Sequence, residues 1–247
     1  MTSNRLVLDL ETTDLLENPD ACIITVGASL LDQKYNLLDR INNGEEVLIN
    51  DHAYDITGLI QSMNPDARRM HEENGLIDAL LDPNIPKFTL AEAEQMILDL
   101  MGRFDHLTTD GRVSLVGLGV GEFDRVFLRK FMPTLEAALH YRSHDYSSFA
   151  KIVQDLAPGI VDFGGAPFDG RAHTAQKDVD QTIRIINWYR QNLLLVNRSN
   201  PVQMKAITNR IISVLRYVVI DGNAVDIFDA LTNTSDLESK IADAIST

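Results

Sequence analysis

Four acidic residues and one histidine, spread over three segments of the chain, are the side chains that most clearly suggest chemistry. They are Asp9, Glu11, Asp124, His173 and Asp178. Carboxylate oxygens are the ligands that hard divalent cations prefer. Acids that converge on two such cations, beside an imidazole that accepts a proton from water, can hydrolyse phosphodiester bonds. We therefore predict that these five side chains meet in one hydrolytic site.

The first pair of acids lies in an apolar strand that we expect over residues 5–10. Residues two apart in a strand point to the same face, so Asp9 and Glu11 should present their carboxylates side by side. With 36 acids in 247 residues, an acid-x-acid pattern should arise about five times by chance. The alternative is a solvated strand end, but the apolar context makes unpaired charge costly.

Asp124 follows a glycine-rich connection over residues 117–121 and lies early in a helix that we expect over 122–131. The glycines permit a tight turn, and an acid in the first helical turn is also favoured by the helix dipole, which is the simpler explanation of Asp124. The loop is not a dinucleotide-binding fingerprint, because Glu122 stands where the third glycine belongs.

His173 comes just before a long helix expected over 174–195, and Asp178 lies inside that helix. A histidine before a helix is often only a cap or a surface residue. Imidazole is nevertheless the side-chain group that best removes a proton from water at neutral pH. Asp180 is a competing acid, but it would lie about 200° round the helix from Asp178.

The remaining pattern predicts an α/β fold, in which a mixed sheet is flanked by helices. Apolar runs favour strands over 5–10, 22–31, 35–41 and 113–118. Helical spacing favours helices over 64–81, 89–103, 122–131, 145–156 and 174–195. Thr89 and Glu92 form a capping box at the start of the second helix.

Arg198 to Pro201 is the clearest break in the chain, and we expect a domain over 1–197 and a helical extension over 198–247. The extension should hold an amphipathic helix over 201–219, a turn at 221–223 and a last short helix that begins near Ser235. It carries no chemical motif. Its apolar faces could complete the core, form a dimer interface or bind a partner protein.

The composition is that of a globular protein, with a hydrophobic fraction of 45% and a net charge of −14. This charge argues against a broad surface for duplex nucleic acid and favours a short or single-stranded substrate. No apolar run approaches the roughly 20 residues of a membrane span, and no signal-peptide pattern is present. The single cysteine, Cys22, cannot form an internal disulfide, so we expect a cytoplasmic protein.

Together, three motifs resemble those of the DEDDh family of 3′→5′ exonucleases. The first is the apolar strand that ends in Asp-Leu-Glu-Thr-Thr over 9–13, and the second is Phe-Asp-Arg-Val-Phe-Leu over 123–128. The third is His173, four residues, then Asp178. The resemblance spans about residues 5–195 and implies a ribonuclease H-like fold, here with a C-terminal helical extension.

The resemblance also implies the chemistry. Four acids would hold two divalent cations, Mg²⁺ or Mn²⁺, and His173 would help to generate the hydroxide that attacks the terminal phosphate. These acids are Asp9, Glu11, Asp124 and Asp178. The substrate would be single-stranded or short RNA or DNA, degraded from its 3′ end to nucleoside 5′-monophosphates. The choice between RNA and DNA depends on a few contacts to the 2′-hydroxyl and stays open.

Two branches of the family are similar to different parts of the chain. Residues 18–28 resemble phage-type exonucleases, whereas 125–147 resemble oligoribonuclease, a family that degrades very short RNAs as a homodimer. The second likeness implies a substrate-binding set in which one apolar residue wedges against the terminal base and others contact the sugar and the 5′ phosphate. The set is Thr12, Leu15, Tyr141, Arg142 and Ser147.

Three single residues and one pair depart from the family pattern. Asp14 stands where glycine is usual, Thr25 where an acid is common, Val120 where a polar residue is common and the pair 70–71 where an aromatic residue is frequent. The metal-binding positions are unaffected, but strict dinucleotide specificity does not follow. Because fold alone does not imply activity, the alternative is a non-catalytic interaction module that keeps the exonuclease fold.

Overall fold

The computed structural model describes residues 3–51, 55–107, 112–156, 173–190, 217–220 and 223–226. The chain divides into two compact units. One comprises Met1–Lys151 with Gly164–Trp188, and the other comprises Ile152–Phe163 with Tyr189–Thr247. All the predicted site residues belong to the first unit. The domain boundary predicted after residue 197 lies outside the described residues and stays a prediction.

The first unit is built on a six-stranded mixed sheet, which confirms the predicted α/β class. Its strand order is β3-β2-β1-β5-β6, with β4 also paired to β2. The pairs β1–β2, β2–β3 and β2–β4 are antiparallel, whereas β1–β5 and β5–β6 are parallel. The strands are β1 (Arg5–Thr12), β2 (Ile23–Leu31), β3 (Leu37–Arg40), β4 (Val47–Leu48), β5 (Ser114–Gly117) and β6 (His144–Asp145).

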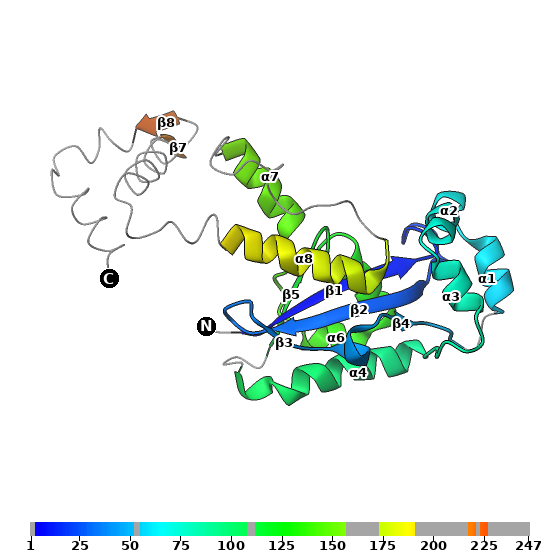
Figure 1. Cartoon of the computed structure of the whole chain (residues 1–247). Coiled ribbons are helices and arrows are strands. Elements are labelled where there is room, and N and C mark those ends of the chain that lie inside the picture. Colours follow the sequence, from blue (N-terminus) through cyan, green and yellow to red (C-terminus); the bar gives the residue numbers. More distant parts are fainter. Residues whose placement is uncertain are drawn as a thin grey trace. The chain divides into compact units, whose positions relative to one another are not determined.

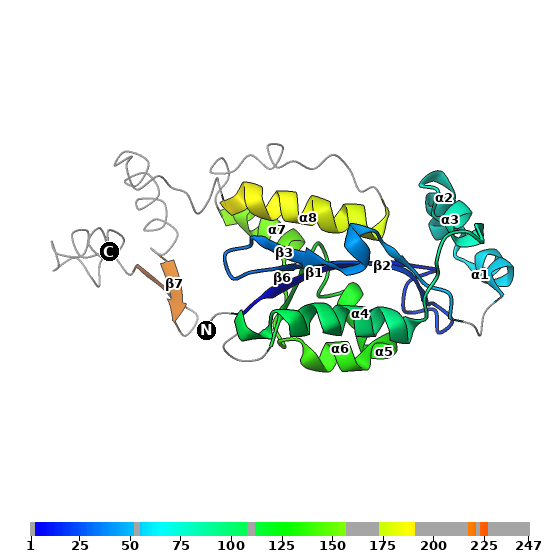
Figure 2. The ribbon, with the colours of Figure 1, turned by 60° about the horizontal axis from the view of Figure 1, so that its bottom comes forward.

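Helices cover both faces of this sheet (Figures 1 and 2). α8 lies along one face, and α4, α5 and α6 cover the other. Two 3₁₀ turns follow β3 and α4, at Ile41–Gly44 and Asp105–Leu107. The helices are α1 (Ile56–Ser62), α2 (Pro65–Glu73), α3 (Leu76–Leu81), α4 (Leu90–Arg103), α5 (Asp124–Phe131), α6 (Pro133–Ala138), α7 (Tyr146–Leu156) and α8 (Ala175–Tyr189).

The side-chain alternation of β1 decides which layer each residue enters. Leu6, Leu8 and Leu10 belong to the large core on the face of α4, α5 and α6. Val7 packs instead in a smaller cluster with Val179 and Ile186 of α8. Since residues two apart share a face, Asp9 and Glu11 lie on the α8 side of the strand, in line with Val7.

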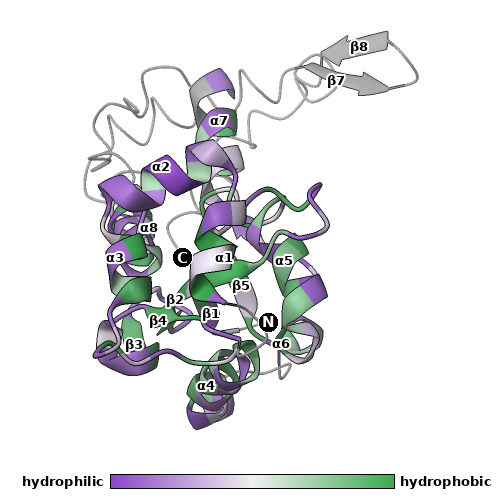
Figure 3. Cartoon of the chain, turned by 90° about the vertical axis from the view of Figure 1, so that its right-hand side faces the viewer, coloured by the Kyte–Doolittle hydropathy of each residue, from purple (hydrophilic) through white to green (hydrophobic). Residues whose placement is uncertain are grey.

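The helical segment predicted over 64–81 is wrong as one continuous helix. It is interrupted at Asn74 and Gly75, where Gly75 takes a positive φ of 82° that ends α2 and starts α3 at a new angle. Glycine adopts this conformation without the penalty that a side chain brings. Figure 3 shows mostly hydrophilic residues on α2. The helix α1 was not predicted.

Other helix boundaries follow local signals. The capping box at the start of α4 is confirmed, since the Thr89 hydroxyl accepts from the Glu92 amide at 3.2 Å and the Glu92 carboxylate accepts from the Thr89 amide at 2.7 Å. α5 ends before Pro133, as predicted, but a second short helix, α6, begins at that proline. Proline at the first helical position loses no hydrogen bond.

The described part of the C-terminal segment is a two-stranded antiparallel sheet, β7 (Tyr217–Ile220) with β8 (Asn223–Asp226). Residues 221 and 222 of the predicted turn lie outside the described residues, and the helix predicted over 201–219 is wrong at its end, because Tyr-Val-Val-Ile favours a strand. The rest of that helix and the one expected near Ser235 lie outside the described residues. Within the described ranges, no helix has the length and apolar character to cross a membrane.

Candidate active site

A cavity of about 830 Å³ contains all five residues of the predicted hydrolytic site. It extends from the end of β1 to α2 and to the starts of α5 and α8. Its lining is unusually acidic, and Arg69 is the one lysine or arginine among the lining residues that the structure describes. The lining carboxylates are Asp9, Glu11, Asp14, Asp66, Glu73, Asp124 and Asp178.

Asp9 and Glu11 reach the cavity because of the register of β1. Their cross-strand neighbours on β2 are Gly27 and Thr25, respectively. Asp9 is half-buried, and Glu11 is only 7% exposed. A carboxylate removed from water to this extent requires compensating positive charge or hydrogen bonds, which fits a cation ligand better than a solvated strand end.

Asp124 is the first residue of α5, and it lines the same cavity. Its Oδ1 accepts a hydrogen bond of 2.9 Å from the backbone amide of Leu10, the residue between the two acids of β1. Asp124 is 3% exposed. This bond fixes the third carboxylate to the strand that carries the first two, although 114 residues separate the partners.

The glycine-rich connection before α5 makes this approach possible. A Cβ on Gly117 would lie 2.7 Å from the Cβ of Val120, and Gly119 has a φ of +77°. Asp145 also organises the loop, because its carboxylate accepts from the backbone amides of Gly119 at 3.2 Å and Gly121 at 3.3 Å. The sequence predicted Asp145 only as the start of a helix.

Asp178 reaches the cavity because α8 packs very closely on β2. A Cβ on Gly27 would lie 2.5 Å from the backbone carbon and oxygen of Ala175, so only glycine fits beneath the first turn of α8. Asp178 is 5% exposed and lies in that turn. The close packing places it on the face of the sheet that bears Asp9 and Glu11.

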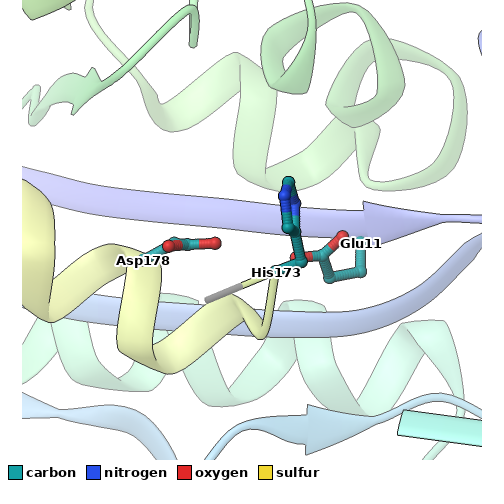
Figure 4. Close-up of side chains that lie close together, drawn as sticks. All are labelled: Glu11, His173 and Asp178. Carbon is teal, nitrogen blue, oxygen red and sulfur yellow. The ribbon is translucent and has the colours of Figure 1, made fainter. Parts of the chain in front are cut away.

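Glu11, His173 and Asp178 form a group that could hold a metal ion. One ligand atom from each lies within 4.8 Å of the others. Figure 4 shows Glu11 on β1 and Asp178 on α8, with His173 on the segment that leads into the helix. The oxygen-rich donor set, completed by Asp9 and Asp124 in the same cavity, suits a hard divalent cation.

The backbone holds His173 in an unusual conformation. Its φ is +50°, which is uncommon for a residue other than glycine. The Asn74 side-chain amide donates a hydrogen bond to the His173 carbonyl oxygen. Asp180, the competing acid on α8, instead forms an ion pair of 2.8 Å with Arg40 and does not line the cavity.

Two ionisable residues near the site were missed by the sequence. The carboxylate of Glu46 accepts from the backbone amide of Ala175 and from the Thr25 hydroxyl at 3.4 Å, and burial raises its pKa. His71 is fully buried, with Nε2 3.1 Å from the carbonyl oxygen of Thr12, and burial lowers its pKa. Neither has a local sequence signal, because both roles depend on distant contacts.

The residues predicted to bind substrate fall into two groups. Thr12 and Leu15 line the cavity, and Leu15 is 58% exposed at its edge. Tyr141, Arg142 and Ser147 are not among the lining residues. Tyr141 is 65% exposed, and the Arg142 guanidinium lies 5.0 Å from the centre of its ring. These assignments stay predictions.

No family model matches the chain. Several curated proteins, however, are similar to it in sequence. The oligoribonuclease of Nocardia farcinica (strain IFM 10152) is 34% identical over 191 residues, which cover 76% of this chain and 81% of the relative. The oligoribonuclease of Rhodococcus jostii (strain RHA1) is 34% identical over 184 residues, which cover 74% of this chain and 84% of the relative.

Solved structures of Escherichia coli exonuclease I share the fold. The complex with a 5cy-dT13 oligonucleotide aligns with a TM-score of 0.54 at 16% identity, over 84% of this chain and 46% of that one. The zinc-bound complex with single-stranded DNA gives a TM-score of 0.56 at 14% identity, over 85% and 43%. This chain thus spans less than half of exonuclease I.

At this identity, the structural likeness establishes the ribonuclease H-like fold, whereas the curated relatives establish the family. The acidic cavity, the three motifs in order and the extent of both alignments all agree. This chain belongs to the oligoribonuclease family of DEDDh 3′→5′ exonucleases.

Proposed function

We propose that this protein is a metal-dependent 3′→5′ exonuclease that hydrolyses short single-stranded oligonucleotides to nucleoside 5′-monophosphates. The observation that carries the proposal is the meeting of four carboxylates and one imidazole in a single cavity. They come from β1, α5 and the start of α8, so local sequence composition alone does not account for their meeting. The name of the curated relatives, oligoribonuclease, supports short RNA as the first substrate to test.

The acids would hold two divalent cations, Mg²⁺ or Mn²⁺. Their buried oxygens fit that role, since Glu11 and Asp178 come within 4.8 Å of one another and of His173. Two such ions supply Lewis-acid stabilisation of the charge that develops on the phosphate oxygens. Asp9, Glu11, Asp124 and Asp178 are the proposed ligands.

His173 is the proposed general base. Its imidazole takes the proton of the attacking water as the new bond from oxygen to phosphorus forms and the bond from phosphorus to the 3′ oxygen of the preceding nucleotide breaks. That 3′ oxygen leaves as a hydroxyl after it takes a proton from solvent water. Asn74 donates a hydrogen bond to the His173 carbonyl oxygen. This bond and the short segment that leads into α8 hold His173 beside Asp178. Positioning of this kind converts a bimolecular step into one within the complex.

Apolar residues on the cavity wall would hold the terminal bases. Leu15, Met70 and Phe123 line it together with Thr12, which lies where the terminal sugar would be contacted. Contacts to the faces of bases tolerate any base sequence. A cavity with such a wall next to the acids suits end-on binding of a short strand.

A homodimer accounts for the residues that do not reach the cavity. Tyr141, Arg142 and Ser147 lie on the surface of this chain or near it, so a second copy could supply them to the substrate. The domain over 1–197 would carry the catalysis, and the extension over 198–247 stays a candidate for part of the dimer interface. We also propose a reducing cytoplasm as the location, because the single cysteine, Cys22, is free and the chain therefore has no internal disulfide.

The test is a time course on matched RNA and DNA oligomers of 2 to about 20 nucleotides, with Mg²⁺, with Mn²⁺ and with EDTA. End-on binding predicts rates that depend on length. We expect 5′-monophosphates to appear from the 3′ end and turnover to stop in EDTA. Absence of hydrolysis under every condition would overturn the proposal and favour a non-catalytic interaction module.

A further inference from the structure

The first turn of α8 is held by an acid from a different part of the chain. Glu46 precedes β4, and its carboxylate accepts a hydrogen bond from the backbone amide of Ala175, the first residue of α8. The same carboxylate accepts from the Thr25 hydroxyl, at 3.4 Å. Thr25 is fully buried and lies directly across from Glu11 in the sheet.

Thr174 stands where a side chain normally accepts a hydrogen bond from the first turn of the helix, but it makes no such bond. Thr174 precedes the helix, where a threonine side chain usually accepts from the amides of the first turn. Its hydroxyl is buried and has no hydrogen-bond partner within the described residues. The amides at a helix start need acceptors, and Glu46 supplies one of them.

Glu46 does this against an unfavourable environment. It is partly buried, and both this burial and the nearby charge of Asp178 oppose its ionised form. The favourable contributions are the Ala175 amide, the Thr25 hydroxyl and Lys177. An acid kept in such a place contrasts with its neighbour Glu45, which is exposed.

We propose that Glu46 is a positioning residue, which fixes the first turn of α8 so that His173 and Asp178 meet Glu11. Two further contacts make this turn sensitive to displacement: the backbone of Ala175 lies against Gly27, and Asn74 binds the His173 carbonyl. The inference deepens the proposed function and rests on it. Partners outside the metal ligands typically contribute about 10- to 100-fold to metal affinity or activity.

The role of Glu46 is that of an acceptor, so its amide analogue should replace it. In Glu46→Gln the carbonyl oxygen can still accept from the Ala175 amide. Glu46→Ala removes the acceptor and leaves the helix start without it. The matched control is Glu45→Ala, which deletes an exposed acid one residue away.

The experiment measures hydrogen exchange of residues 175–178 by mass spectrometry in the full chain, together with kcat, KM and the half-activating Mn²⁺ concentration. We expect faster exchange in Glu46→Ala, about a tenfold lower kcat or a similar rise in half-activating Mn²⁺, and little change in KM. Glu46→Gln should restore most of each property, and Glu45→Ala should match the wild type.

Two outcomes would overturn the inference. One is unchanged exchange and metal activation in Glu46→Ala. The other is a loss in Glu46→Gln equal to that in Glu46→Ala, which would assign the effect to charge or to general destabilisation. Thermal unfolding of each variant identifies a global loss of fold. If the wild type hydrolyses nothing, the proposed function fails, whereas the exchange measurement still decides whether Glu46 fixes the helix.

Discussion

The side chains at the two ends of the cavity are positioned by different kinds of contact. At the inner end, Glu11, Asp124 and Asp178 are each less than 10% exposed and come from three separate elements. Their positions depend on long-range contacts, such as the bond from the Leu10 amide to Asp124 and the packing of α8 on Gly27. The fold as a whole places these side chains.

At the outer end, Asp14, Asp66 and Arg69 are held by near neighbours. Asp66 and Arg69 form an exposed ion pair of 3.0 Å within α2. Hydrogen bonds from Asn18 and the Leu15 amide lower the pKa of Asp14. Because exposed pairs of this kind contribute little to stability, residues of the outer wall can change with small effect on the fold. We infer that residues at the inner end determine kcat and that residues at the outer end determine the affinity for substrate.

The largest effect should come from the proposed metal ligands. We expect Asp178→Ala and Asp9→Ala to lower kcat by about 10⁴-fold or more, since a member of a catalytic unit is removed, with no loss of the circular dichroism signal. Asp180→Ala is the matched control, because Asp180 lies on the same helix, pairs with Arg40 and does not line the cavity. Equal losses in Asp178→Ala and Asp180→Ala would contradict the proposal that Asp178 acts as a metal ligand.

The next effect should come from the packing of α8. In Gly27→Ala the new methyl group would lie 2.5 Å from the Ala175 backbone. Overpacking of this kind costs about 1–3 kcal/mol, and the shift of the helix should also lower kcat. Urea unfolding and steady-state rates measure both effects.

The control for this prediction is Gly102→Ala in α4. A Cβ there meets nothing within 4 Å, so the substitution should be neutral or stabilising by up to about 1 kcal/mol. If both glycines respond alike, close packing of α8 is not the cause.

A smaller effect should appear in the pH dependence of stability. Burial lowers the pKa of both His71 and His144. In each case the unfolded chain takes up a proton near pH 6.5, before the folded protein does. Their contribution to stability is therefore complete above that pH and is lost as the pH falls from 6.5 towards the lowered pKa of the folded state.

We expect the free energy of unfolding to decrease between pH 7.5 and 5.5, and to decrease less in His144→Gln and His71→Gln. Glu46 acts in the opposite direction, because its raised pKa lets the folded state take up a proton first. Urea titrations at several pH values measure the balance. A steeper loss in the histidine variants would contradict the assignment.

The smallest effect should come from a substitution at the outer end of the cavity. Arg69→Ala should raise KM a few-fold, corresponding to about 1 kcal/mol at most, with kcat unchanged, because Arg69 is the one lysine or arginine in the described cavity lining. Loss of one phosphate contact should also reduce the salt dependence of KM. Arg68→Ala is the control, since Arg68 pairs with Glu72 and does not line the cavity.

The sequence predicted well wherever the information is local. Each acid of the inner end lies in a motif of a few residues, and the apolar runs of β1 and β2 identify the central strands. The capping box of α4 is likewise contained within residues 89–92. These features depend on neighbours in the chain, so periodicity and capping rules reach them.

Features that depend on distant contacts were missed. Nothing near Glu46 indicates that it binds the start of α8, and Gly27 reads as an ordinary small residue until Ala175 is placed on it. The helix predicted over 64–81 failed at Gly75, which takes a left-handed conformation between α2 and α3. Residues 217–219 form part of β7 and not the end of the predicted helix, because aromatic and β-branched residues favour a strand and the backbone pairs with β8.

The left-handed backbone at His173 has a practical consequence. Among side-chain-bearing residues, asparagine tolerates this conformation particularly well. His173→Asn therefore removes the imidazole while it preserves the local chain path that Asn74 holds. Such a protein would be a suitable trap, able to retain an uncut strand long enough for crystallographers to see which end enters first.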